Sequence, residues 1–299
     1  MMRVFLVDGT YELFRHFHGA PPHVNPAGLN VGAARTAAGS ILSILEQGAT
    51  HIGVATDHVI ESWRNEAWPA YKSSAGVPKE LLDQFGLFED LLSALGIVVW
   101  PMIELEADDA MASAAAVLDA DPAVTQVVIC TPDKDLGQCV RGGRVVCLDR
   151  RKNLVVDEPV VRERFGVGPE SVPDWLAVVG DSADGYPGIK GWGAKSASAV
   201  LHRYEHIEQV PLDHARWDVP LTPARTESLR SALAGAWEEA LLFKRLATAT
   251  IDPSLLGARP LDALQWTGPT PELDRLCAVV ESPGLARRAR ELAQRASTS

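Results

Sequence analysis

The sequence predicts an α/β fold, in which a mostly parallel sheet with helices on both faces is followed by a helical region. Short apolar segments alternate with helical patterns over the first half of the chain, which is typical of a parallel sheet. After Phe165 the strand patterns fade and only helical patterns remain. We therefore expect an α/β core over residues 1–166 and a helical part over residues 167–299.

The individual elements follow from apolar spacing and from Gly and Pro positions. Strands are expected at residues 3–7, 51–56, 97–100, 125–130 and 144–148. Apolar residues recur at intervals of three and four in helices expected at residues 31–47, 81–95 and 107–118. The second part is expected to hold helices at residues 172–179, 194–204, 222–243, 271–280 and 283–296, several of them separated by Pro/Gly-rich segments.

Composition limits the class of protein. The 299 residues include 39 Asp and Glu against 28 Lys and Arg, and 46% are hydrophobic, which excludes a wholly disordered chain. The net charge of −11 argues against a protein that coats nucleic acid by bulk positive charge, although a local basic groove remains open.

The cysteines and the apolar segments bear on the compartment. Cys130, Cys139, Cys147 and Cys277 form no C-x-x-C pair, so we expect free thiols rather than zinc ligands or a disulfide framework. The apolar run at residues 4–7 is too short for a signal peptide, and no run approaches the length of a membrane span. A soluble, cytoplasmic protein is expected.

Acidic residues follow the expected strands, at ends that share one edge of a parallel sheet. They are Asp8, Asp57, Glu106, Asp108, Asp109, Asp133 and Asp135. Ligands usually bind at this edge, and clustered carboxylates without Cys or His favour Mg²⁺ or Mn²⁺. Glu106 and Asp109 would share a helix face, and Asp133 and Asp135 would point the same way if their loop is extended.

Each acid also has a structural alternative. Asp8 before Gly9 would shape a turn, Asp108 or Asp109 would cap a helix, and Asp133 and Asp135 would be solvated loop residues. The joint placement after strands favours the metal site. Residues 6–10 are also similar to the nucleophile loop of haloacid-dehalogenase-like phosphatases, but Leu6 stands where that chemistry needs a carboxylate.

The most distinctive segment is the Gly-rich stretch over residues 180–197. Its Gly191-x-Gly193 turn precedes an expected helix, and the free amides of a helix start attract phosphate. Lys190 and Lys195 add positive charge on either side, as in modules that bind the nucleic-acid backbone without reading bases. An ordinary Gly-rich connection is the alternative, but the adjacent Asp181 and Asp184 extend the acidic set. Trp192 inside this turn is expected to lie near DNA.

In their order along residues 3–210, these motifs resemble the 5′-3′ exonuclease and flap endonuclease family, particularly the N-terminal 5′-nuclease domain of bacterial DNA polymerase I. The matching blocks are residues 6–18, 56–72, 106–109, 131–136 and 180–195. The resemblance implies a PIN-like, Rossmann-like core, a helical arch near residues 60–90, and a helix–three-turn–helix region.

The resemblance also implies site roles. Its metal-binding carboxylates match Asp8, Asp57, Glu106, Asp108, Asp109, Asp133, Asp135, Asp181 and Asp184. Its phosphate-contacting positions match Lys72, Tyr71 and Arg15. Its DNA-binding turn matches Gly188, Lys190, Gly191, Gly193 and Lys195, where a monovalent cation can also bind. Nine of the 39 acids therefore fall in metal motifs, which leaves acids and bases close to balance.

The expected activity is two-metal hydrolysis of DNA phosphodiesters, on DNA with 5′ flaps, nicks or free 5′ ends. Because no polymerase segment follows, we expect a stand-alone monomer. Ala75 stands where the family carries an arch Arg, and Trp63 and Asn65 stand where it usually carries Phe and His. The Ala75 departure keeps open a non-catalytic protein that binds branched DNA, and an RNase on the same core is a further alternative.

Overall fold

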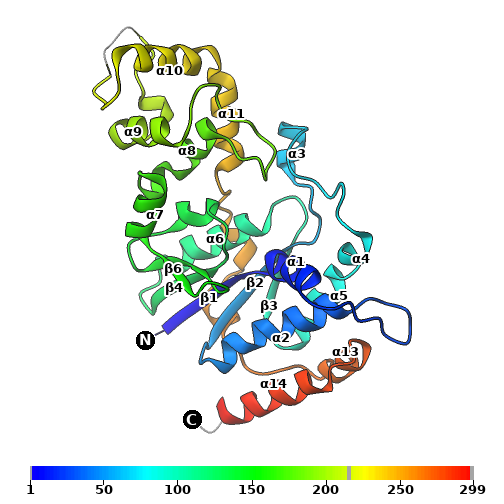
Figure 1. Ribbon diagram of the computed structural model, residues 1–299. Helices are drawn as coiled ribbons and strands as arrows, with labels where there is room; N and C mark the ends of the chain where they lie inside the picture. The colour runs from blue at the N-terminus through cyan, green and yellow to red at the C-terminus, as the bar shows by residue number, and fades with distance from the viewer. Residues whose placement is uncertain (1, 214–216, 297–299) are drawn as a thin grey trace. The chain divides into compact units, whose positions relative to one another are not determined.

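The structure, a computed structural model, describes residues 2–213 and 217–296, which form two compact units (Figure 1). The first unit combines Met1–Ile60, Ser74–Thr131 and Thr250–Ser299, and the second combines Glu61–Ser73 and Pro132–Ala249. Each unit is thus assembled from segments that alternate along the chain. The boundary expected near residue 166 stays a prediction.

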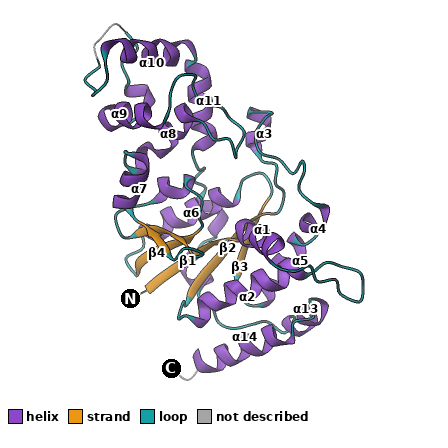
Figure 2. Cartoon of the chain, viewed as in Figure 1, coloured by secondary structure: helices purple, strands orange, loops and turns teal. Residues whose placement is uncertain are grey.

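The first unit is built on four parallel strands in the order β3-β2-β1-β4 (Figure 2). They are β1 (Met2–Asp8), β2 (His51–Asp57), β3 (Val98–Met102) and β4 (Val124–Cys130). The register pairs Val4 with His51 and Val127, and Gly53 with Val98. The expected parallel α/β architecture is therefore confirmed, and β1 and β2 are buried strands of Val, Ile, Leu and Ala as that architecture requires.

Helices complete the first unit, and α1 and α6 contact its strands directly. They are α1 (Gly9–Gly19), α2 (Gly32–Glu46), α4 (Lys79–Leu82), α5 (Phe85–Ala94), α6 (Ala107–Asp119), α12 (Pro260–Leu264), α13 (Leu273–Val279), α14 (Pro283–Ala296) and the 3₁₀ helix η4 (Pro253–Leu256). The expectation of one helix over residues 81–95 was wrong, because the structure has two helices there, α4 and α5. Gln84 lies between them and caps α2 instead, because its Oε1 accepts hydrogen bonds from the amides of Ala33 and Ala34 at 3.0 and 3.1 Å.

The last fifty residues return to the first unit. The Trp266 amide donates to Thr50 O and its indole Nε1 to Leu95 O, both at 2.8 Å. Gly96 has φ +79°, and a Cβ there would stand 2.0 Å from Gly268 O, so this close approach requires glycine. Helix α14 packs on α2, where Arg288 donates to both carboxylate oxygens of Glu46 at 2.7 and 2.8 Å.

The second unit contains an antiparallel pair of strands and most of the shorter helices. The strands are β5 (Val145–Asp149) and β6 (Leu154–Val156). The helices are α3 (Trp63–Ala67), η1 (Asp135–Cys139), α7 (Glu158–Phe165), η2 (Pro169–Ser171), α8 (Val172–Val179), α9 (Ala194–Tyr204), η3 (Ile207–Gln209), α10 (Pro223–Gly235) and α11 (Trp237–Ala247). The single helix expected over residues 222–243 is two helices, with the break directly after Gly235.

The core of the second unit is aromatic and lies where α8 packs on α11. Tyr186 stacks on Phe243 with ring centroids 5.5 Å apart, and Trp68 meets the same ring edge-on at 5.2 Å.

Among the described residues, no helix is both long enough and apolar enough to cross a membrane. The four cysteines carry free thiols.

Candidate active site

In the first unit, Asp8 lies at the carboxyl end of β1, where it also begins α1. Its Oδ1 accepts a hydrogen bond from the Tyr11 amide at 2.8 Å, and its Oδ2 accepts one from Thr131 Oγ1 at 2.8 Å. The carboxylate is 8% exposed. Asp8 therefore caps α1, a role that the sequence suggested only for Asp108 or Asp109, and this capping fixes the carboxylate at the edge of the sheet.

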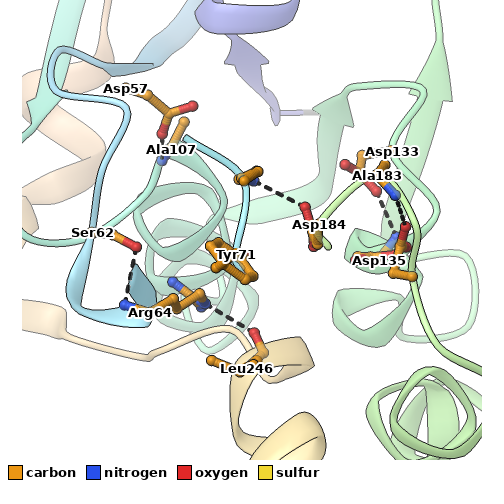
Figure 3. A network of polar contacts seen from close by, with 12 residues as sticks. Asp57, Ser62, Arg64, Tyr71, Ala107, Asp133, Asp135, Ala183, Asp184 and Leu246 are labelled. Carbon is orange, nitrogen blue, oxygen red and sulfur yellow. Dashed lines mark hydrogen bonds and ion pairs between the residues drawn. The ribbon is translucent and has the colours of Figure 1, made fainter. Parts of the chain in front are cut away.

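Asp57 ends the neighbouring strand β2 and faces the start of α6 (Figure 3). Its Oδ1 accepts a hydrogen bond from the Ala107 amide at 2.7 Å, and its own amide donates to Thr10 Oγ1 at 2.7 Å. The adjacent Glu106, a buried residue, is the N-cap of α6, and Asp108 lies in its first turn. Since β1 and β2 are parallel and pair Asp8 with Ala55, these acids share the carboxyl edge of the sheet.

Asp109 differs from the other acids of this edge because both of its oxygens bind backbone amides. Oδ2 accepts from the Glu106 amide at 3.0 Å, and Oδ1 accepts from the Thr250 amide at 2.7 Å. The residue is fully buried. These contacts favour the helix-capping alternative for Asp109 and give it a second role, that of anchoring the returning segment at Thr250.

In the second unit, three carboxylates form a cluster. One oxygen each of Asp135, Asp181 and Asp184 lies within 4.8 Å of the others. Asp181 and Asp184 share a tight loop after α8, closed by hydrogen bonds between Asp181 and Tyr186 at 2.9 and 3.0 Å. Asp135 begins η1, and its amide donates to Asp133 Oδ1 at 2.8 Å (Figure 3). The condition of an extended loop is not met, because the chain turns at Lys134 into the 3₁₀ helix that begins at Asp135.

The electrostatics of this cluster suit a cation. Burial and the neighbouring Asp133 raise the pKa of Asp135 to about 8. Within the described residues, Asp135 Oδ1 has no hydrogen-bond partner, although Lys134 Nζ lies 3.4 Å away and also pairs with Asp181. Burial lowers the pKa of Lys134, but the carboxylates of Asp135 and Asp181 outweigh it and raise that pKa overall.

The donor set also decides which cation fits. The cluster offers carboxylate oxygens and neither thiolate nor imidazole, which suits a hard divalent ion. Burial raises the pKa of the nearby Tyr186 hydroxyl further above its ordinary value, and the Asp135 carboxylate adds to this. A cation among the carboxylates would relieve the same repulsion. The residues present therefore fit a divalent metal site.

Lys72 and Tyr71 belong to the same unit and lie beside this cluster. Lys72 Nζ is 3.4 Å from Asp184 Oδ1 and 5.5 Å from the centre of the Tyr71 ring. The Lys72 amide donates to Asp184 O at 3.0 Å, which joins the two segments through the backbone as well. The structure thus brings together the basic and acidic residues that the sequence placed more than a hundred positions apart.

Arg15 lies on α1 in the first unit. Its Nη2 donates to Glu12 Oε2 at 2.5 Å and to Ser40 Oγ at 3.2 Å. Glu12 is almost fully buried, so this ion pair fixes the guanidinium against α2. A role of Arg15 in phosphate contact stays a prediction.

The Gly-rich turn begins α9 and is exposed at its basic residues Lys190 and Lys195. Gly188 has φ +70°, and a Cβ there would stand 2.4 Å from Gly180 N. Gly191 has φ +88°, and Gly193 is the N-cap of α9. Trp192 is buried and its Nε1 donates to Leu229 O at 3.2 Å, so the ring packs inside the unit, and its proximity to DNA stays a prediction.

The helical arch expected near residues 60–90 stays a prediction. The segment contributes residues 61–73 to the second unit and residues 74–90 to the first. Lys79, the next basic residue after Ala75, forms an exposed ion pair with Asp83 at 2.5 Å. Three residues beside the site were missed by sequence reasoning: Lys134, Asn65 and Trp68. Lys134 forms an ion pair with Asp181, Asn65 donates to Lys72 O and Trp68 donates to Gly185 O, and no local sequence pattern indicates these contacts.

Comparison with known proteins gives this geometry its family. Residues 3–166 match the 5′-3′ exonuclease N-terminal resolvase-like domain, and residues 167–272 match the 5′-3′ exonuclease C-terminal SAM fold. DNA polymerase I of Rhizobium leguminosarum is 35% identical over 218 residues, which are 69% of this chain and 21% of that protein. DNA polymerase I of Pseudomonas aeruginosa is 32% identical over 260 residues, covering 84% of this chain and 27% of the relative. The chain therefore spans about a quarter of the length of these relatives.

Solved structures share the fold at low sequence identity. The T5 5′-exonuclease superposes with a TM-score of 0.62 at 19% identity, over 96% of this chain and 100% of that one. The catalytic core of Rad2 in complex with DNA substrate gives a TM-score of 0.59 at 14% identity, over 97% and 92%. The two family profiles together match most of the chain, and the predicted family and fold are confirmed. The chain belongs to the 5′-3′ exonuclease family.

Proposed function

We propose that the chain is a divalent-metal-dependent 5′-3′ exonuclease and flap endonuclease that hydrolyses DNA phosphodiester bonds and leaves a 5′-phosphate. The observation that carries this proposal is the cluster of Asp135, Asp181 and Asp184 with Lys72 Nζ at 3.4 Å from Asp184. It combines carboxylates for divalent ions with a cation for the scissile phosphate. The polymerase relatives and the T5 flap endonuclease, solved with DNA and metal ions, support it by homology and by fold.

The motif carboxylates other than Asp109, whose two oxygens accept backbone amides, would bind Mg²⁺ or Mn²⁺, some directly and some through water. When bound, two such ions supply positive charge at the phosphate and lower the pKa of a coordinated water. Lys72 Nζ lies 3.4 Å from Asp184, one of the proposed metal ligands. Its ammonium would therefore need to move only a short way from Asp184 to bind an oxygen of a phosphate held at the metal site. The buried Tyr71 ring limits the directions that the Lys72 side chain can take.

The proposed DNA contacts lie at the Gly-rich turn. Gly191 and Gly193, where a Cβ would meet no atom within 4 Å, leave the backbone open to phosphates, Gly188 closes the turn against Gly180, and the exposed Lys190 and Lys195 add charge. This arrangement suits binding to the duplex next to a 5′ flap, a nick or a free 5′ end. A monovalent cation at the carbonyls of the turn belongs to the same proposal, as does action as a monomer.

The test is a cleavage assay on 5′-flap, nicked, blunt and single-stranded DNA, with Mg²⁺ and Mn²⁺ in parallel. Asp181→Ala is expected to reduce metal-dependent cleavage by at least about a hundredfold. Asp218→Asn, which changes an exposed acid of the same unit at a side chain 88% exposed, serves as the matched control and should cleave normally. Cleavage that survives Asp181→Ala at full rate would contradict the metal assignment.

Ala75 favours one other candidate, a protein that binds branched DNA without cleaving it. This candidate predicts tight binding to the flap substrate and no product at any Mn²⁺ concentration. An RNA oligonucleotide in the same assay tests the RNase alternative, because preferential cleavage of RNA would contradict a DNA nuclease.

A further inference from the structure

We propose that Asn65 is a positioning residue for Lys72, an inference that rests on the nuclease function proposed above. Asn65 lies on α3, seven residues before Lys72 and within the same unit. Its side chain contacts the backbone of the segment that carries the phosphate-contacting lysine. In the described part of the chain, the side-chain hydrogen bonds of Asn65 go to the backbones of Ser62, Tyr71 and Lys72, so we expect an effect separate from metal binding.

The backbone of Lys72 is held on both sides. Its amide donates to Asp184 O at 3.0 Å, and its carbonyl accepts from Asn65 Nδ2 at 2.9 Å. The same Nδ2 lies 3.4 Å from Tyr71 O. Because both backbone polar groups of Lys72 are hydrogen-bonded, its Cα has a defined position. At the far end of the side chain, Nζ lies 3.4 Å from Asp184 Oδ1.

Asn65 itself is held by the start of α3. Its Oδ1 accepts from the Ser62 amide at 2.9 Å, while Ser62 Oγ accepts from the Arg64 amide at 3.3 Å. The side-chain amide offers an acceptor for the Ser62 amide and a donor for the Lys72 carbonyl at the same time. A carboxylate of the same shape would keep the first contact and lose the second.

Helix α3 is anchored to the core of the unit, so that Asn65 acts from a fixed support. Arg64 is 3% exposed, and it donates through Nε to Leu246 O at 2.9 Å and through Nη2 to Thr248 O at 3.2 Å (Figure 3). These carbonyls lie at the C-terminus of α11, where a cation is favourable. The anchor therefore ties α3 to the helix whose Phe243 stacks on Tyr186.

A second contact holds the segment against the acidic loop. Trp68 Nε1 donates to Gly185 O at 3.0 Å. Gly185 has φ +83°, and a Cβ there would stand 2.0 Å from Ala70 O, so the two backbones touch. The Lys72 segment and the loop of Asp181 and Asp184 are therefore joined by these contacts, and in this proposal Asn65 fixes the backbone from which the Lys72 side chain extends.

The experiment is a double-mutant cycle on the full chain, with Asn65→Asp, Lys72→Gln and the double variant. Asn65→Asp is expected to lower kcat about 10- to 100-fold, with little change in KM or in the Mg²⁺ concentration for half-maximal rate. In the Lys72→Gln background the same change should cost less than about twofold, because its effect passes through Lys72. Equal losses in both backgrounds would overturn the proposal.

The matched control is Asn25→Asp in the first unit. Asn25 is buried where Asn65 is half-buried, and it likewise donates through Nδ2 to a backbone carbonyl, Val279 O at 2.9 Å, and accepts backbone amides at Oδ1. It should leave kcat unchanged within about twofold, since it holds no site segment. Asn65→Ala, which introduces no charge, replaces Asn65→Asp if the latter does not fold.

Hydrogen exchange measured by mass spectrometry gives a readout independent of catalysis. Asn65→Asp should speed exchange in peptides covering residues 66–76 and leave peptides of α14 unchanged. A wild-type chain that cleaves none of the substrates would refute the proposed nuclease function. In that case the hydrogen exchange of residues 66–76 would still test the positioning role. Faster exchange in Asn65→Asp than in wild type would support it, and the same exchange in both would overturn it.

Discussion

Replacing Asp135 by Asn should stabilise the metal-free protein at alkaline pH, against the usual effect of changing a buried polar residue. Asp135 is buried among Asp133, Asp181 and Asp184, and its pKa is raised to about 8. The folded chain therefore holds a proton that the unfolded chain has released above pH 4. Asn keeps the shape of the protonated acid and never ionises.

The magnitude follows from the pKa difference. The shift from 3.8 to about 8 is roughly four units. At about 1.4 kcal/mol per unit, the ionised Asp135 costs up to about 6 kcal/mol of the free energy of unfolding. The penalty is absent below pH 4, grows as pH rises, and is complete above pH 8. Neighbouring acids share the charge, so we expect Asp135→Asn to gain at least about 2 kcal/mol at pH 8.5.

The assay is urea unfolding of wild type and Asp135→Asn in EDTA, at steps from pH 4 to pH 8.5. The gain of the variant should be largest at pH 8.5 and should vanish near pH 4. Adding Mn²⁺ should reverse the order, because a ligand that binds only the folded wild-type site stabilises it in proportion to the logarithm of its concentration.

Asp149 provides the control of opposite sign. Hydrogen bonds from Lys152 outweigh the effect of burial and lower the pKa of Asp149, so its stabilisation is present above the unfolded pKa and is lost as pH falls. Asp149→Asn should therefore destabilise the protein at neutral and alkaline pH. If Asp135→Asn is no more stable than wild type at pH 8.5, the ionised Asp135 does not destabilise the metal-free protein, and the reasoning is refuted.

Three further outcomes are expected. Gly185→Ala should lower the free energy of unfolding by at least about 1–3 kcal/mol in urea titrations, because φ is +83° and the new Cβ would stand 2.0 Å from Ala70 O. Arg64→Met should cost about 1–3 kcal/mol in the same titrations, because the buried Leu246 carbonyl and the Thr248 carbonyl just beyond α11 lose their charged donor, and a loss below about 0.5 kcal/mol would contradict this. Changing Lys190 and Lys195 together to Gln should weaken flap-DNA binding and reduce the slope of log affinity against log salt by roughly two, as fluorescence anisotropy would measure, whereas an unchanged slope would exclude them from phosphate contact.

Elements whose ends carry local signals could be predicted from the sequence to the residue. Helices α8 and α14 follow Ser-Val-Pro and Ser-Pro starts, and α9 follows the Gly193 N-cap, so all three match the expected ranges. The helix over residues 81–95 failed because a contact with α2 uses Gln84. Strand β6 is three residues long, too short for alternation to be detected.

The candidate site divides in the same way. The acids of the motifs could be named from residue types and spacing, and the structure brings Asp135, Asp181 and Asp184 together, while the role of all nine as metal ligands stays a prediction. The double hydrogen bonding of Asp109 could not, since its partner Thr250 lies 141 residues on. The proposed role of Asn65 could not be predicted either, because it depends on a turn that brings the Lys72 carbonyl next to the side-chain amide of Asn65.

The return of residues 250–299 to the first unit also has a consequence for synthesis on the ribosome. Strand β2 and helices α2 and α5 are made early, yet Thr50, Glu46 and Leu95 receive their partners Trp266 and Arg288 only after about 170 to 240 further residues have been made. Contacts of such long sequence separation form slowly. The second unit, complete at Ala249, can therefore fold before the first, so that the emerging chain exposes the apolar surfaces of α2 and α5 until the final helices arrive.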